Sequence, residues 1–283
     1  MRTRLTIALL FVASLAVGAE IRGTWAAIVR GDRVQLNMMR DRSNWSRTLP
    51  RSDFAITDAQ VNALAEAPVH FVMSRDAGTI DFNGTFESGE GVGRFTFTPS
   101  VNFASTLRSL GVAPDEALDD EKLFSLAMHD ISVAFIREMQ ALGYRENLDT
   151  YVRFRIHGVT PQFVRSLKDL GYSAGAEDLV RFRIHGMTPE FATAMRDLQV
   201  KNLTAEQLVR MRIHGVSPDY VRELRDLGYA GLDSDDLVRM RIHGVTTEFI
   251  RKLAEAGYHG IPADKLVQMR IRGIGPEMLR QSQ

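Results

Sequence analysis

The sequence predicts an α+β protein in which an antiparallel β unit precedes an array of short helices. Two observations predict this class. Apolar and polar residues alternate through most of residues 20–99, which is typical of strands with one buried face. From residue 100 onward a motif recurs every 28 or 29 residues, which is typical of a helical-repeat array. We expect residues 1–19, ahead of both parts, to be a signal peptide.

The first residues have the pattern of a secretory signal. Arg2 and Arg4 precede an apolar run over residues 5–17, which is short for a membrane span. Small residues at 17–19 are typical of a cleavage site. We therefore expect export to a bacterial periplasm or the medium. Retention of the segment as a membrane anchor is the alternative.

Five sets of alternating apolar residues predict a five-stranded antiparallel meander over residues 20–99. We expect a flexible hairpin turn over residues 88–93, because a strand follows the glycines there and a phosphate-binding loop would need a helix. The five sets are Trp25, Ala27 and Val29; Val34, Leu36 and Met38; Val69, Phe71 and Met73; Ile80, Phe82, Gly84 and Phe86; and Phe95 and Phe97.

One short helix is predicted inside the β unit. Thr57-Asp58-Ala59-Gln60 has the pattern of a capping box and predicts a helix through Ala67, packed on the sheet by Val61 and Leu64. We interpret the other conspicuous side chains of the unit as packing residues rather than as a ligand site. These are Trp25, Trp45 and His70.

The phrase Arg-Ile-His-Gly marks the helical repeat. A weaker copy lies at residues 127–130, and Arg-Ile-Arg-Gly ends the series at 270–273. Each copy is expected to hold two helices of about ten residues, which are not stable alone and must stack into an α-solenoid. We expect about six two-helix repeats plus a terminal half repeat over residues 100–283. The four full copies end at Gly158, Gly186, Gly215 and Gly244.

Capping residues delimit the two helices of each repeat. The first helix begins at a Thr-Pro or Ser-Pro pair, as at Thr160-Pro161, and ends at a Gly-Tyr pair, as at Gly171-Tyr172. The second begins near Thr204 or Asp233 and ends at the glycine of the phrase. We expect its apolar side to comprise Leu208, Val209, Met211 and Ile213, matched by Leu237, Val238, Met240 and Ile242.

The histidines of the phrase form a column with one member per repeat. Equivalent side chains on stacked helices lie roughly 8–10 Å apart, whereas zinc needs nitrogens about 2.0–2.1 Å from one point. We therefore expect these histidines to interact with the free carbonyls at helix ends. Metal binding is the alternative, with His157, His185, His214 and His243 as its ligands.

Arginines form a second column, which is the candidate interaction surface. Such a stripe could recognise carboxylates or phosphates through bidentate hydrogen bonds, or it could form ion pairs between repeats. The members of this arginine column are Arg155, Arg183, Arg212, Arg241 and Arg270.

A further set of arginines lies two residues earlier in four of these repeats: Arg153, Arg181, Arg210 and Arg239. Their spacing from acidic residues predicts i,i+4 ion pairs within the second helices, and more widely an inter-repeat network. The expected pairs are Glu177–Arg181, Glu206–Arg210 and Asp235–Arg239.

The last turn, residues 271–277, looks like a helix-hairpin-helix element, whose glycine-bounded turn offers amides to a DNA phosphate. The earlier copies fit less well, because Thr188 replaces the second glycine and Glu190 follows the proline. The 35 basic and 35 acidic residues also leave no net positive charge for phosphate binding. Nucleic acid is therefore an alternative partner rather than the expected one.

The repeat phrase Arg-Ile-His-Gly-Val-Thr-Pro-x-Phe resembles tandem repeats in the extracytoplasmic tails of antirepressor-type membrane metallopeptidases of the penicillin-sensor class. The segments Gly23-Thr24-Trp25, Val34-Gln35-Leu36-Asn37, Asp76-Ala77-Gly78-Thr79 and Arg94-Phe95-Thr96-Phe97-Thr98-Pro99 resemble the β unit ahead of those repeats. The membrane helices and zinc-binding peptidase motif of that class are missing from this sequence. The resemblance implies an envelope sensing or interaction module without peptidase activity.

No enzyme motif accompanies the repeats. The chain has no His-Glu-x-x-His, no Gly-x-Ser-x-Gly and no Walker-type loop, and it has no cysteine for thiolate catalysis or disulfides. Asp119-Asp120-Glu121 is interpreted as a helix cap. We expect a non-enzymatic exported scaffold that needs no cofactor and binds another macromolecule, with a protein as partner. An envelope hydrolase is the alternative that location alone suggests.

Overall fold

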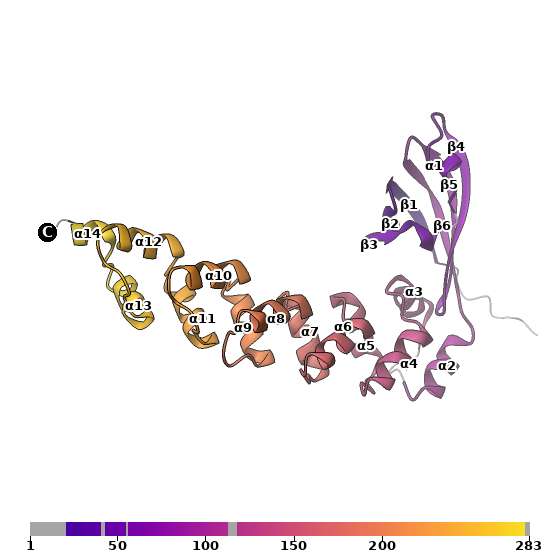
Figure 1. Ribbon diagram of the computed structural model, residues 1–283. Helices are drawn as coiled ribbons and strands as arrows, with labels where there is room; N and C mark the ends of the chain where they lie inside the picture. Colours follow the sequence, from indigo (N-terminus) through magenta and orange to yellow (C-terminus); the bar gives the residue numbers. More distant parts are fainter. Residues whose placement is uncertain (1–20, 41–42, 55, 113–117, 281–283) are drawn as a thin grey trace, which may run out of the picture. The chain divides into compact units, whose positions relative to one another are not determined.

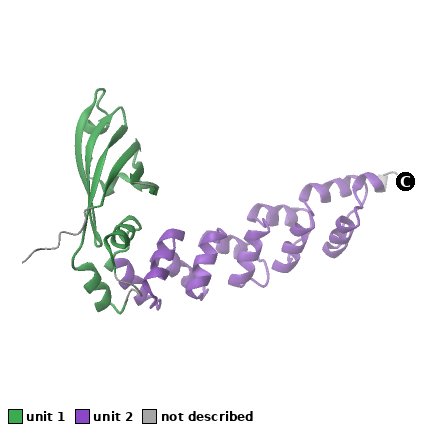
Figure 2. Cartoon of the chain, turned by 180° about the vertical axis from the view of Figure 1, so that it is seen from behind, with its two compact units in different colours: residues 1–133 green, residues 134–283 purple. Residues whose placement is uncertain are grey.

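The computed structural model describes residues 21–40, 43–54, 56–112 and 118–280, and it has the expected α+β layout (Figure 1). The chain divides into two compact units, one ending at Val133 and the other starting at Ala134 (Figure 2). The expected signal peptide lies outside the described residues. In the described part of the chain, no helix combines the length and apolar character that a membrane span requires.

The first unit contains a six-stranded antiparallel sheet with the strand order β3-β2-β1-β6-β5-β4. Strands β1 to β3 form one meander and β4 to β6 another, and β6 pairs with β1 to join them. The strands are β1 (Ile21–Arg30), β2 (Arg33–Arg40), β3 (Ser43–Pro50), β4 (Ala67–Arg75), β5 (Gly78–Glu87) and β6 (Glu90–Pro99).

The prediction of five strands was wrong by one, because β3 has no regular apolar alternation. As an edge strand it pairs only with β2, and only Trp45 of its residues takes part in an aromatic contact. The expected inner faces of the other strands are confirmed except at Val29, which is half-buried; their other aromatic and aliphatic residues are buried. His70 is the exception among the predicted packing residues: it is exposed and lies 3.2 Å from Asp81.

The link between the two meanders is shorter and less regular than predicted. The capping box is confirmed, because Thr57 and Gln60 exchange hydrogen bonds of 3.0 and 3.3 Å. However, helix α1 covers only Asp58–Val61, after a single 3-10 turn η1 (Arg51–Asp53). Val61 is buried as expected, but Leu64 is 90% exposed and does not pack on the sheet. The hairpin turn before β6 is also tighter than expected, because Glu90–Gly93 belong to the strand.

Trp25 is the centre of the sheet core, and two glycines make room for it. Its ring lies 5.2 Å from that of Phe71, and its Nε1 donates to the Asn83 carbonyl oxygen at 3.2 Å. Gly84 and Gly93 face each other on adjacent strands beneath the indole. A Cβ at Gly93 would lie 2.0 Å from the Asn83 oxygen and 2.7 Å from Trp25 Nε1. The glycine-rich segment therefore serves packing.

Helices α2 (Phe103–Ser109) and α3 (Asp120–Met128) lie within residues 100–283, where the helical array was expected, but they belong to the sheet unit. Asp119 caps α3 by accepting from the Lys122 amide at 2.8 Å, which confirms the interpretation of the acidic run. Phe124 of α3 stacks on Phe95 with centroids 5.8 Å apart and also contacts Trp45. The compact unit thus extends beyond the expected boundary at residue 99.

The second unit is an array of two rows of short helices (Figure 1). We call one row the first helices: α4 (Val133–Ala141), α6 (Pro161–Asp169), α8 (Pro189–Asp197), α10 (Pro218–Asp226), α12 (Thr247–Glu255) and α14 (Pro276–Arg280). The other row, the second helices, comprises α5 (Leu148–His157), α7 (Ala176–Ile184), α9 (Ala205–Ile213), α11 (Ser234–Ile242) and α13 (Ala263–Ile271). Within each row, helices of successive repeats lie against each other.

The predicted caps account for the helix ends. Thr160, Thr188 and Ser217 each accept a hydrogen bond from the third amide of the following helix, and Pro is the first helical residue. At the other end, Gly186 has φ +67° and donates to the Arg183 carbonyl, while buried Met187 donates to that of Phe182. This is the Schellman arrangement. Left-handed Asp130 and Gln199 occupy the same turn position without glycine.

Gly93→Ala is expected to lower the free energy of unfolding of the sheet unit by more than about 3 kcal/mol, or to prevent its folding, because the new methyl group clashes with fixed backbone. Urea unfolding followed by tryptophan fluorescence measures this, since both tryptophans lie in that unit. Val92→Ala is the control: its side chain is 60% exposed on the other face, and we expect a change under about 0.5 kcal/mol. Equal midpoints for the two variants would contradict this account of the core.

Candidate interaction surface

The arginine column lies over aromatic rings of the first helices. In every described repeat the guanidinium carbon of a second-helix arginine is 4.9–5.1 Å from the centroid of a ring in the preceding helix. This distance is typical of a cation–π contact. The pairs are Arg155–Phe135, Arg183–Phe163, Arg212–Phe191, Arg241–Tyr220 and Arg270–Phe249.

The same arginines reach the glycine turn of the repeat before. Arg183 Nε donates to the His157 carbonyl oxygen at 3.4 Å, and a Cβ at Gly158 would lie 3.1 Å from Arg183 Nη2. The turns at Gly186, Gly215 and Gly244 are covered in the same way by the next arginine. The arginines of the candidate interaction surface therefore make contacts inside the array. They lie over the aromatic ring of the preceding first helix, and they cover the glycine turn of the repeat before.

The second set of arginines forms an ion-pair ladder between repeats. Arg153 makes two hydrogen bonds of 2.6 Å to the Glu177 carboxylate of the next second helix. This pairing lowers the pKa of Glu177 below its usual value and raises the pKa of Arg153. Arg181–Glu206 and Arg210–Asp235 repeat the contact at 2.5 and 2.7 Å.

The expected inter-repeat network is therefore present, but the specific i,i+4 pairs are not the ones that form. In three successive repeats the acid pairs with the arginine of the repeat before. Arg181 and Arg239 each pair within their own helix with an acid three residues earlier, Asp178 and Asp236. The i,i+4 spacing allows an ion pair within one helix. The carboxylate of the neighbouring second helix nevertheless lies closer to the arginine.

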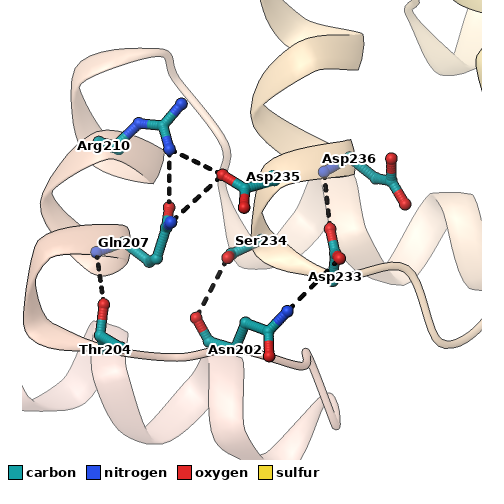
Figure 3. A network of polar contacts seen from close by, with 8 residues as sticks. All are labelled: Asn202, Thr204, Gln207, Arg210, Asp233, Ser234, Asp235 and Asp236. Atoms are coloured by element: carbon teal, nitrogen blue, oxygen red, sulfur yellow. Dashed lines mark hydrogen bonds and ion pairs between the residues drawn. The ribbon is translucent and has the colours of Figure 1, made fainter.

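The ladder is one part of a wider polar seam between adjacent second helices (Figure 3). Between α9 and α11, Asp235 also accepts from the Gln207 amide at 3.2 Å. Beside it, buried Ser234 donates to the Asn202 carbonyl oxygen at 3.1 Å. Thr204 and Asp233 meanwhile cap the two helices. Every charged group in this seam has a partner, so the seam holds the repeats together.

The histidine column stands at helix ends, as expected. His185, His214 and His243 are the C-cap residues of α7, α9 and α11, and His157 is the last residue of α5. Within the described residues, no three His, Asp or Glu side chains gather where they could hold a metal ion.

The earlier copy of this turn, at residues 184–190, fits the helix-hairpin-helix pattern less well and carries its own anion. The Glu190 carboxylate accepts hydrogen bonds from its own backbone amide and from Thr188, and Arg183 lies nearby. These contacts lower the pKa of Glu190. A phosphate approaching this helix start would meet a carboxylate instead of free amides.

One surface feature was missed by the sequence analysis, and it involves isoleucine. The isoleucine of every Arg-Ile-His-Gly or Arg-Ile-Arg-Gly phrase is 50–56% exposed, in five consecutive repeats. We call this set the isoleucine column: Ile156, Ile184, Ile213, Ile242 and Ile271. The prediction that Ile213 and Ile242 join the buried side was wrong.

The position of each isoleucine around its helix could have predicted its exposure. Ile242 follows buried Met240 by two residues, which is a rotation of about 200° around the helix. The two side chains therefore point in nearly opposite directions. Leu237, Val238 and Met240 face the core as predicted, and Ile242 faces outward.

Grooves run beside the isoleucine column where adjacent second helices meet. One of 330 Å³ lies between α9 and α11 and another of 320 Å³ between α5 and α7. Both have the same lining at equivalent positions: a valine floor (Val238 or Val180), an isoleucine wall (Ile242 or Ile184) and ladder residues at the rim. The outer face of the second helices thus repeats one surface unit along the array.

Comparison with models of known protein families finds no match for this chain, and comparison with curated proteins finds none either.

Arg212→Ala is expected to lower the free energy of unfolding of the array by about 1 kcal/mol, because the ring contact with Phe191 and the cover over the Gly186 turn are lost. Its neighbour provides the control. Ile213→Ala should change that free energy by less than about 0.5 kcal/mol, since the isoleucine is half-exposed. Urea unfolding followed by far-ultraviolet circular dichroism measures both; a larger loss for Ile213→Ala would reverse the assignment of the two columns.

Tyr220 makes array stability depend on alkaline pH. Burial raises its pKa to about 12, while its hydroxyl donates to the Val245 carbonyl oxygen at 2.7 Å. Because the unfolded chain ionises this group near pH 10, stability should fall between pH 10 and 12. Phenylalanine stands at this position in other repeats, so Tyr220→Phe fits the site. It should cost about 1 kcal/mol at pH 8 and reduce the alkaline fall, measured by urea unfolding at each pH. An unchanged alkaline fall in the variant would contradict the role of Tyr220.

Proposed function

We propose that this protein is an exported, non-enzymatic scaffold that binds another protein through the isoleucine column and its grooves. The observation that carries the proposal is the column itself. Five aliphatic side chains occupy one exposed position in five successive repeats, although the array does not need them for its own core. Exposed apolar residues scattered singly are common on protein surfaces, whereas a regular set on one face marks an interaction site.

Helix α3 supports the proposal because its corresponding face is covered by protein. Met128 stands two repeats before Ile184 in the 28-residue period and is only 5% exposed. Phe124, at the groove-floor position, lies on the sheet aromatics, and Glu121, at the ladder-acid position, pairs with Arg40 of β2. In α3 the floor and acid positions therefore contact the sheet, and the isoleucine position is buried.

Charge and chemistry at the column favour a protein partner over a polyanion. The ladder arginines pair with acids, and the arginine column lies over aromatic rings. What this face exposes is therefore apolar side chains. An apolar protein surface would bury them, whereas a phosphate backbone would not. The export part of the proposal is supported by the sequence of residues 1–19 alone, and the envelope role by the resemblance of the repeats.

A comparison of two triple variants tests this function. Immobilised full chain, with residues 1–19 removed, is exposed to envelope extract, and saturably bound proteins are identified by mass spectrometry. Ile184→Ser, Ile213→Ser and Ile242→Ser combined should reduce the binding of the specific partner more than about tenfold, because each removes a central apolar contact. Arg196→Ser, Arg225→Ser and Lys252→Ser combined change exposed first-helix residues instead and should leave binding intact.

Circular dichroism melting must show that both triple variants keep the array folded. Partner binding that survives the isoleucine changes would remove the column as the binding surface. The absence of any saturable partner, including the protein itself, would overturn the scaffold function.

A further inference from the structure

The isoleucine column repeats with the period of the array, which restricts what can cover it. Its five members recur every 28 or 29 residues, at one position of each second helix. Stacked helices lie roughly 8–10 Å apart, so the column presents apolar side chains at about that interval. A partner that buries all five must offer apolar groups at the same interval over the same length.

A peptide in the extended β conformation does not have this interval on one face. An extended strand returns to the same face every 6.4–6.8 Å, that is, after two residues of about 3.2–3.4 Å each. Such a strand would align with one or two isoleucines and then fall out of step. A second copy of this array has the required interval by construction, because its own isoleucine column has the same five members.

The charges beside the column are compatible with a second copy. Along the ladder, positive and negative groups alternate and are already paired: Arg153 with Glu177, Arg181 with Glu206, and Arg210 with Asp235. The ladder therefore adds no row of like charge that would repel its duplicate. Buried Val180 and Val238 form the groove floors beside the column, so the neighbouring surface is also partly apolar.

We propose that the partner of the isoleucine column is a second copy of this chain, which pairs with the first through a two-fold axis at Ile213. This inference rests on the proposed function and names the occupant of its surface. Ile213 is the third of five members, so a two-fold axis there brings it opposite itself and covers the whole column in both copies. Interfaces of this self-complementary kind are the commonest among protein oligomers.

Sedimentation equilibrium of the purified full chain without residues 1–19, with no other protein present, tests the inference. Over about 1–100 µM, the wild type should show a reversible monomer–dimer equilibrium. Ile213→Lys should weaken association at least tenfold, because the two-fold axis places two lysine charges together in an apolar contact. Leu64→Lys is the matched control, since Leu64 is also an exposed aliphatic residue but lies in the sheet unit; it should leave the equilibrium unchanged.

Mixing two variants tests the axis itself. Ile213→Lys and Ile213→Glu should each be monomeric alone, and an equimolar mixture should associate at least tenfold more tightly than either one. Circular dichroism melting checks that each variant keeps the wild-type fold. A monomeric wild type over the whole range would overturn the inference, as would a dimer that Ile213→Lys does not weaken or a mixture that gains nothing.

These results separate the two proposals. A monomeric protein that retains a different protein through the isoleucine column keeps the proposed function and loses this inference. A protein that neither dimerises nor retains any partner loses both.

Discussion

Everything in the second unit depends on the fact that its helices are too short to stand alone. Most have nine residues, and helices of that length are marginal in water even with favourable sequences. Each must therefore bury its apolar side against neighbours in sequence and in the stack. The turns make this possible: left-handed residues such as Gly186 and Gly215 close helices, and the buried residues after them, Met187 and Val216, enter the core. The chain can then start the next helix at once, with Thr or Ser as its cap.

Two different kinds of arginine contact connect successive repeats, and they lie on different sides of the second helices. The arginine column covers an aromatic ring and a glycine turn, so its positive charge is used where the carbonyls at a helix end are negative. The ladder arginines cross to the acid of the next second helix on the outer side. These charged side chains form contacts inside the array. The balance of basic and acidic residues is therefore a consequence of how the repeats are joined. On the outer face of the second helices, the isoleucine column remains as a repeated exposed apolar feature.

The sheet unit and the array differ in what covers the outer face of a second helix. In α3 the sheet covers it: Phe124 meets Phe95 and Phe97, and Met128 is buried. In α5 to α13 the equivalent face carries isoleucines that are about half-exposed. The contrast within one chain explains why α3 belongs to the first unit although its sequence continues the repeat. It also explains why we look to the outer face, and not to the turns or the histidines, for a binding partner.

Local chemistry in the sequence determined the class of the fold and most element ends. Alternation located five strands, and capping residues such as Thr188 and Asp119 located helix starts, because these effects act within a few residues. Contacts between distant segments were decided only by the tertiary structure. Edge strand β3 needs little apolar alternation, and Phe124 joins α3 to the sheet. Glu177 pairs with Arg153 of a neighbouring helix rather than with Arg181. Which residues of a repeat face solvent depends on where the next repeat lies, and for that reason the isoleucine column became visible only in three dimensions.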